Sequence, residues 1–559
     1  MLQLATIATA AIVAGPIAAG LLGVAMPAFG IIPALGSSSL SLDAWQRLLE
    51  QPGLLRSALI ALASGLVTTA ISLGIVFLFL ASSAGTRLLT WVRRLVAPLL
   101  AVPHAAAAVG MAFLIAPSGL IARALSPWAT GWLRPPDILI VHDPWGLAMM
   151  AGLVVKEVPF LLLMSLTMLP ALEPARRIAI ARSLGYRPVT AWLKVVAPGL
   201  YPLVRLPVYA VVAYASSTVD VALILGPTNP PTLAVSVLRW FSDPDLSMRS
   251  MASAGALAQL TVTMVALALW RVGEALLARG GAAWMASSDR GIAERPMAVV
   301  GPAGIALAGG ALASALVGLV IASLSWTWRF PNLLPDTLSS ATWSRAGPVL
   351  LETLATTAMI AGPATALALA AALAILESAA ASSRPRHDLT PLFYLPLLVP
   401  QVPFLFGLVV GAEAVRFRPG YLPVLLGHFV FVLPYVLLSL SEAYRRFDDR
   451  WLMLGRTLGA SAGRTFWAIR LPILLGPCLA AAAVGLAVSV GQYLPTLLLG
   501  AGRLETVTTM AVALTSGGDR RVVGAWALAQ ALLPVLGFAL AVLLPRAVWR
   551  NRRALRNTS

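Results

Sequence analysis

Nine long stretches without a charged side chain constrain the fold of this sequence more than any other feature. None contains Lys, Arg, Asp or Glu, and they span 1–42, 57–86, 95–122, 250–270, 296–328, 353–376, 389–412, 471–502 and 522–545. About 20 apolar residues in a helix cross the hydrocarbon core of a bilayer, where a helix satisfies its own backbone hydrogen bonds. We therefore expect an all-α integral membrane protein.

Composition supports this class. The 559 residues are 59% hydrophobic and 11% charged, whereas soluble domains are roughly 45–50% apolar and about 25% charged. The pattern predicts about twelve transmembrane helices, near 5–32, 57–81, 96–116, 146–170, 203–225, 251–277, 298–325, 350–376, 391–411, 421–441, 473–499 and 522–545.

The two halves of the chain resemble each other. PLLAVPH at 98–104 matches PLLVPQ at 396–401, and GLVVKEVPFLLLMSL at 152–166 matches GHFVFVLPYVLLSLS at 427–441. An even number of spans gives both copies the same orientation, so we expect two parallel six-helix repeats. The predicted first half is 1–277 (core 57–277), followed by a cytoplasmic linker at 278–297 and a second half at 298–559 (core 350–546).

The basic residues are distributed unevenly between the two sides of the predicted bundle. If both termini face the cytoplasm, the inside segments hold 26 of the 40 Lys and Arg residues, which agrees with the positive-inside rule. The net charge of +18 is then explained by basic loops facing anionic membrane lipid. No nucleic-acid partner is needed to explain it.

One basic loop occurs twice. RSLGYRPVTAWLKVVAP runs from Arg182 to Pro198, and RTLGASAGRTFWAIRLP runs from Arg456 to Pro472. Each follows the fourth span of its half. Gly185 and Gly459 suit a left-handed turn, and each closing Pro suits the first turn of the next helix. We expect a helix–turn–helix lying across the cytoplasmic face, suited to docking a soluble partner twice.

These loops resemble the "EAA" loop of permease subunits in binding-protein-dependent ABC importers of type I. The spacing Gly-x9-Ile/Val-x-Leu/Ala-Pro is present in both copies, and VGQYLPTLLLGAG at 490–502 is similar to the following segment in the iron, thiamine, polyamine and molybdate branch. The family's Glu is absent, since Glu-Ala-Ala reads Ala179-Ile180-Ala181 and Met453-Leu454-Gly455 here. The candidate docking residues are Arg182, Gly185, Trp192, Pro198, Arg456, Gly459, Phe466 and Pro472.

The resemblance implies a fused two-domain permease in a bacterial inner membrane. It would work with an ABC ATPase, in two copies, and with a periplasmic solute-binding protein. The chain's only lysines, Lys156 and Lys194, do not follow Gly, so no P-loop exists here. We therefore expect no enzyme activity and no cofactor in this chain, with ATP bound by the partner. Four histidines at unsuitable spacing and one cysteine predict no metal site.

Five polar residues in predicted spans are candidates for the substrate pathway. Lys156 and Glu157 lie side by side in an otherwise uncharged run, and charges within a membrane usually face a cavity or a partner. Asp220 lies in the fifth span, and its counterpart region holds Gln492 and Tyr493. A structural charge pair, or close helix packing, would explain the same residues without a substrate.

The alternative function is a twelve-helix secondary transporter, which would also show a six-plus-six repeat. That class usually carries a charged signature after the second span, whereas ASSAGTRLLTWVRR at 81–94 contains no acidic residue. The solute itself is left open by the sequence.

Overall fold

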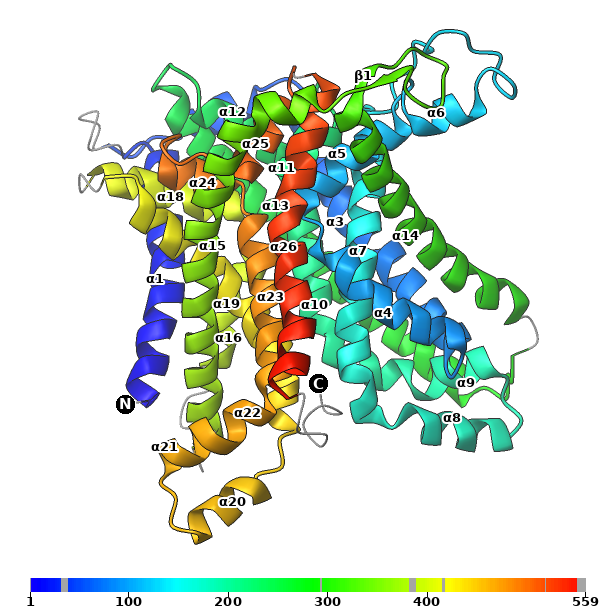
Figure 1. Cartoon of the computed structure of the whole chain (residues 1–559). Helices are drawn as coiled ribbons and strands as arrows, with labels where there is room; N and C mark the ends of the chain where they lie inside the picture. The colour runs from blue at the N-terminus through cyan, green and yellow to red at the C-terminus, as the bar shows by residue number, and fades with distance from the viewer. Residues whose placement is uncertain are drawn as a thin grey trace.

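In the computed structural model of the chain, long helices form one bundle (Figure 1). The structure describes residues 2–31, 39–291, 294–381, 389–414, 418–517 and 519–549. Both ends of the described chain lie on the side of the bundle that carries the two repeated loops, here called the loop side. On the opposite side a short hairpin pairs β1 (Ser325–Thr327) with antiparallel β2 (Thr337–Leu338).

Among the described residues, nine helices are long and apolar enough to span a membrane, or up to eleven if two bent pairs each count as one span. The sequence predicts about twelve spans. In place of the full span expected at 391–411, the structure has the shorter apolar helix α18. The main helices are α1 (Leu2–Ala28), α3 (Leu54–Ser83), α5 (His104–Ile115), α7 (Leu147–Met168), α10 (Ala197–Ser217), α13 (Met248–Ala286), α14 (Glu294–Leu324), α15 (Ala341–Ala381), α18 (Gln401–Ala414), α19 (Tyr421–Arg445), α23 (Leu475–Val490) and α26 (Arg520–Val548).

Shorter helices connect these elements. In the first half they are α2 (Asp43–Leu49), α4 (Arg87–Ala101), α6 (Leu120–Leu125), η2 (Leu169–Leu172), α8 (Pro174–Ser183), α9 (Pro188–Val195), α11 (Asp220–Leu225) and α12 (Leu233–Phe241). In the second half they are α16 (Thr390–Phe393), α17 (Leu395–Leu398), α20 (Arg450–Thr457), α21 (Ala462–Thr465), η3 (Phe466–Arg470), α22 (Leu471–Ile473), α24 (Leu494–Gly500) and α25 (Val507–Leu514).

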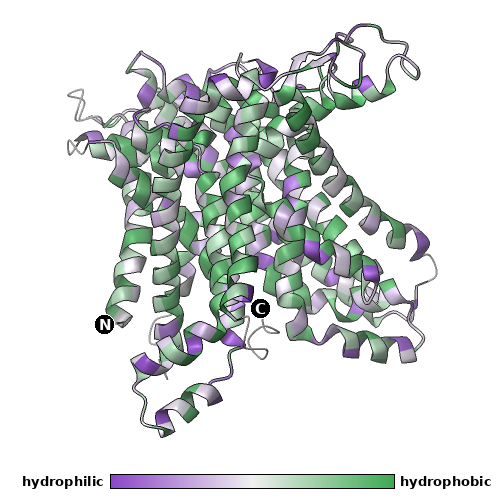
Figure 2. Ribbon diagram, viewed as in Figure 1, coloured by the Kyte–Doolittle hydropathy of each residue, from purple (hydrophilic) through white to green (hydrophobic). Residues whose placement is uncertain are grey.

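The outside of the bundle is apolar over its middle, and polar residues gather at its two ends (Figure 2). Leu307 on α14, Leu351 on α15 and Leu540 on α26 are all more than half exposed. A soluble monomer rarely exposes such an extended apolar surface, which is the surface that lipid chains cover. The main core cluster joins residues of both halves. The chain is an all-α integral membrane protein.

The first helix of each half packs against helices of the other half. Helix α1 packs against α18, and α14 packs against α3 and α5. The α1–α18 crossing is very close, because a Cβ added to Gly20 would lie 2.2 Å from the Phe404 carbonyl oxygen, and one added to Gly407 would overlap Gly20. Small residues permit this approach between membrane helices. The two sequence repeats are therefore interlocked and do not form separate bundles.

The predicted linker at 278–297 is mostly helical. Helix α13 continues to Ala286 and α14 begins at Glu294, so only residues 287–293 separate them. Residues 292 and 293 lie outside the described part of the chain.

Candidate functional site

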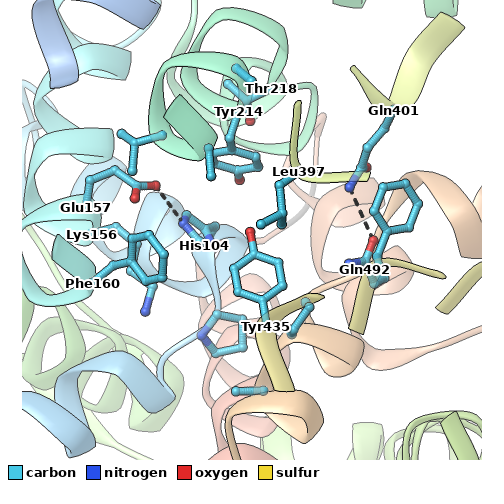
Figure 3. A pocket seen from close by; sticks show the side chains of 18 of the residues that line it. His104, Lys156, Glu157, Phe160, Tyr214, Thr218, Leu397, Gln401, Tyr435 and Gln492 are labelled. Carbon is cyan, nitrogen blue, oxygen red and sulfur yellow. Dashed lines mark hydrogen bonds and ion pairs between the residues drawn. The ribbon is translucent and has the colours of Figure 1, made fainter. Parts of the chain in front are cut away.

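A cavity of about 160 Å³ lies between the two halves (Figure 3). The first half contributes α5, α7 and α10 to its walls, and the second half contributes α17, α18, α19 and α23. The five residues singled out in the sequence all line it: Lys156, Glu157, Asp220, Gln492 and Tyr493.

Four interruptions of helical structure meet at this cavity. Two are the repeated Pro motifs, where the chain leaves α4 before Pro103 and leaves α17 before Pro400. The other two are the short breaks between α10 and α11 and between α23 and α24. Non-helical backbone is tolerated at membrane depth where it lines a cavity. The repeats thus break in matching places and turn polar groups toward a common space.

The adjacent charges on α7 have different partners, because neighbouring residues on a helix point about 100° apart. The Lys156 ammonium donates to the carbonyl oxygens of Leu100 at 2.9 Å and Leu99 at 3.3 Å, in the last turn of α4. Those carbonyls have no partner within their own helix. The Glu157 carboxylate instead lies 3.1 Å from Nε2 of His104 at the start of α5. Lys156 therefore stabilises the end of α4, and Glu157 joins α7 to the start of α5 through His104.

Asp220 follows the break in the fifth span and is 8% exposed. Its Oδ1 accepts hydrogen bonds from the Thr218 hydroxyl at 3.0 Å and from the Tyr214 hydroxyl at 3.4 Å. The Tyr214 ring lies 4.8 Å from the ring of His104. Both donors to Asp220 are neutral.

The second half provides a neutral wall. Gln401 donates to the side-chain oxygen of Gln492 at 3.4 Å (Figure 3). His428 joins the two sides of the break beside Gln492, since its ring nitrogens lie 2.8 Å from the Ser489 hydroxyl and 2.9 Å from the Thr496 hydroxyl. This bridge fixes the unwound segment in place.

The first repeated loop consists of α8, a turn and α9, and it lies across the loop side (Figure 1). Gly185 has the left-handed backbone predicted for it, with φ of +86°. Pro198 occupies the first turn of α10, as expected, and the chain bends by 61° between α9 and α10. Trp192 is fully buried against Phe77, so it anchors α9 to the bundle and offers no surface to a partner.

The second loop repeats this plan with α20, a turn and α21–η3. Gly459 has φ of +83°, Pro472 lies in the first turn of α22, and the chain bends by 73° before α23. Phe466 is partly buried, whereas Trp467 beside it is 69% exposed. The glycine and proline predictions are confirmed in both copies.

Both loops expose an apolar, a basic and an apolar side chain before the glycine. Arg182 in the first copy and Arg456 in the second are exposed on the surface. Each is flanked by two exposed apolar side chains, which are Ile180 and Leu184 in one loop and Leu454 and Leu458 in the other. The same surface pattern thus occurs twice on the same side of the molecule.

Sequence reasoning missed several residues of the cavity. His104 reads as an ordinary packed histidine in the sequence, and Gln401, Tyr214 and Tyr435 do not stand out, yet all four line the cavity. The signal for two of them was the repeated Pro motif, in which His104 and Gln401 occupy equivalent positions.

Comparison with known proteins agrees with this architecture. The model of the family described as "Binding-protein-dependent transport system inner membrane component" matches residues 366–550. The inner membrane ABC transporter permease protein YnjC of Escherichia coli is 34% identical over 535 residues, which cover 94% of this chain and 96% of the relative. The molybdenum transport system permease protein ModB of Mycobacterium tuberculosis is 27% identical over 136 residues, covering 22% of this chain and 52% of that protein.

Similarity to YnjC extends through both halves, so it includes the two loops and the cavity. The chain belongs to the family of inner-membrane permease components of binding-protein-dependent ABC transport systems.

Proposed function

We propose that this chain forms the whole translocation pathway of an ABC importer, with both permease halves fused. It would receive a small solute from a periplasmic binding protein and pass it across the inner membrane of a bacterium. The energy would come from a separate ATPase that docks in two copies, one on each repeated loop. The loop side, with both termini, would then face the cytoplasm.

The observation that carries this proposal is the pair of matched loops. Each presents an apolar–basic–apolar surface ahead of a left-handed glycine, and each is joined by a sharp bend to the helix that enters the cavity wall. A force applied to either loop would therefore act directly on α10 or α23. That connection suits alternating access driven by ATP binding and hydrolysis in the partner.

The cavity fits the same role. It lies between the repeats and is walled by broken helices of both, which is where transporters commonly bind substrate. The candidate pathway residues Lys156, Glu157, Asp220, Gln492 and Tyr493 would contact or orient the solute there. Transport, and no covalent chemistry, is then what this chain contributes.

The test is copurification from native membranes in mild detergent, with the mass of the intact complex measured. We expect one chain with two copies of a P-loop ATPase. The single variants Leu184→Asp and Leu458→Asp should each lose one copy, and the double variant should lose both, because each places a charge in one apolar docking surface.

Leu334→Asp is the matched control. Leu334 is 65% exposed, similar to Leu184, but it lies in the segment between β1 and β2 on the opposite side of the molecule. This variant should retain both ATPase copies. A wild-type chain that purifies alone under several gentle conditions would count against the proposal, as would equal ATPase loss in Leu334→Asp.

A further inference from the structure

The charged groups around the cavity differ in whether their charge is already compensated. Lys156 is committed to two carbonyl oxygens of α4, and Glu157 is paired with His104. Among the residues that the structure describes, the donors to Asp220 are two neutral hydroxyls, and both donate to Oδ1. Within the described residues, no Lys, Arg or His forms an ion pair with Asp220.

A buried carboxylate without a cation is costly, because two hydroxyl donors replace only part of its hydration. Asp220 is only 8% exposed, and it lines the cavity directly. A positively charged group entering the cavity would offset that cost. An oxyanion would instead meet the carboxylates of Asp220 and Glu157.

The aromatic side chains around Asp220 also favour a positively charged ligand. Tyr214, Tyr435, Tyr493 and Phe160 all line the cavity, and the Phe160 and Tyr435 rings lie 6.2 Å apart (Figure 3). The faces of aromatic rings attract cations, and this attraction strengthens when the cation is desolvated. The neutral wall formed by Gln401 and Gln492 would supply both hydrogen-bond donors and acceptors.

We propose that this cavity selects a small organic cation, with the Asp220 carboxylate binding a positively charged nitrogen of the transported solute. The cavity of about 160 Å³ is smaller than the ~300–1,000 Å³ of sites for drug-sized ligands, which limits the solute to a small molecule. This inference rests on the proposed transport function and specifies its substrate class.

The test measures the charge preference of the cavity in the purified full chain. Cys478 is the only cysteine in the sequence, so its replacement by Ala gives a background without thiols. A Gln401→Cys substitution then places one thiol in the cavity wall. The thiol is reacted with a cationic and an anionic methanethiosulfonate, and the cationic rate is divided by the anionic rate. This ratio is then normalised by the same ratio measured at Ala129→Cys, an exposed position.

We expect the normalised ratio to favour the cationic reagent by about tenfold or more. Asp220→Asn should remove most of that preference, whereas Asp220→Glu should retain it and so show that the charge is responsible. Asp137→Asn, at an exposed aspartate, should leave it unchanged. Gln492→Asp, which adds a carboxylate at the matching break of the second half, should raise it.

Preference for the anionic reagent, or a ratio unaffected by Asp220→Asn, would overturn the proposal. So would a thiol that neither reagent reaches, since the solute would then have no access. None of these outcomes depends on the ATPase, so failure here leaves the copurification result standing, and the reverse also holds.

Discussion

The first loop is held by the segment that joins the two halves, whereas the second loop is held by a helix of its own half. In the first, the Lys194 ammonium donates to the carbonyl oxygens of Asp289 at 2.9 Å and Ser287 at 3.1 Å, and Glu294 accepts from the Thr190 amide at 2.7 Å. In the second, Arg470 pairs with Glu377 and Asp449.

The equivalent positions show that these supports are not shared. Ala468 stands where the first loop has Lys194, and Val196 stands where the second has Arg470. What the copies keep is the exposed surface and the glycine turn. The difference teaches that two copies of a loop can keep the same exposed pattern and turn while each is supported by contacts particular to its surroundings.

The largest effect is expected from removing the support of the second loop. Arg470 is 4% exposed and contacts two carboxylates, so Arg470→Met would leave Glu377 without its cation. We expect a loss of about 2–3 kcal/mol in free energy of unfolding, less than breaking a fully buried ion pair would cost, because Glu377 is 21% exposed. Hydrogen exchange should accelerate in α20 and η3 and stay unchanged in α9, with the exposed Arg464→Met as control. Equal acceleration in both loops would contradict separate supports.

The two glycine turns should respond almost equally. Gly185→Ala and Gly459→Ala each force a side chain into the left-handed region, which costs about 1–2 kcal/mol. An added Cβ meets only the flexible Arg290 side chain at 3.3 Å in the first loop and nothing within 4 Å in the second. Denaturant unfolding in detergent measures both, with Gly463→Ala in α21 as control. A difference of several kcal/mol between the loops would show that the turns are not equivalent.

A smaller effect is expected from Glu294→Gln. The Glu294 carboxylate caps the start of α9, accepting from the amides of Thr190 at 2.7 Å and Val189 at 3.4 Å. Removing its charge at a helix N-terminus should cost about 0.5–1 kcal/mol. Exchange of the Thr190 amide reports this directly, and the second loop should not change. Glu173→Gln, at an exposed glutamate, is the control, and an equal effect there would show that no specific cap exists.

The smallest effect concerns pH. Hydrogen bonds from the Gly291 amide and the Trp284 indole lower the pKa of Asp289 below its usual value. A carboxyl group whose pKa is lowered on folding stabilises the folded state above its unfolded pKa, and this stabilisation disappears as pH falls through the folded pKa. The melting temperature of the wild type should exceed that of Asp289→Asn at neutral pH and converge with it below about pH 4. A constant difference across that range would show that the charge of Asp289 is not involved.

Features with a strong local cause could be predicted from the sequence. Apolar runs predict the spans, a glycine at a fixed place in a repeated loop predicts the left-handed turn, and unusual charges in a span predict the cavity residues. Trp192 could not be placed correctly, because its burial depends on Phe77, which is remote in sequence. The supports at Glu294 and Arg470 were missed for the same reason, since each is a contact between distant segments.

The exchange of first helices between the halves has a consequence for how the chain is made. Helix α1 leaves the ribosome before its partner α18, which is synthesised almost 400 residues later. At about 5–20 residues per second, α1 must wait in the bilayer for tens of seconds before its close-packed neighbour exists. The face of α1 around Gly20, which α18 covers in the finished bundle, therefore lacks that partner until the second half is inserted.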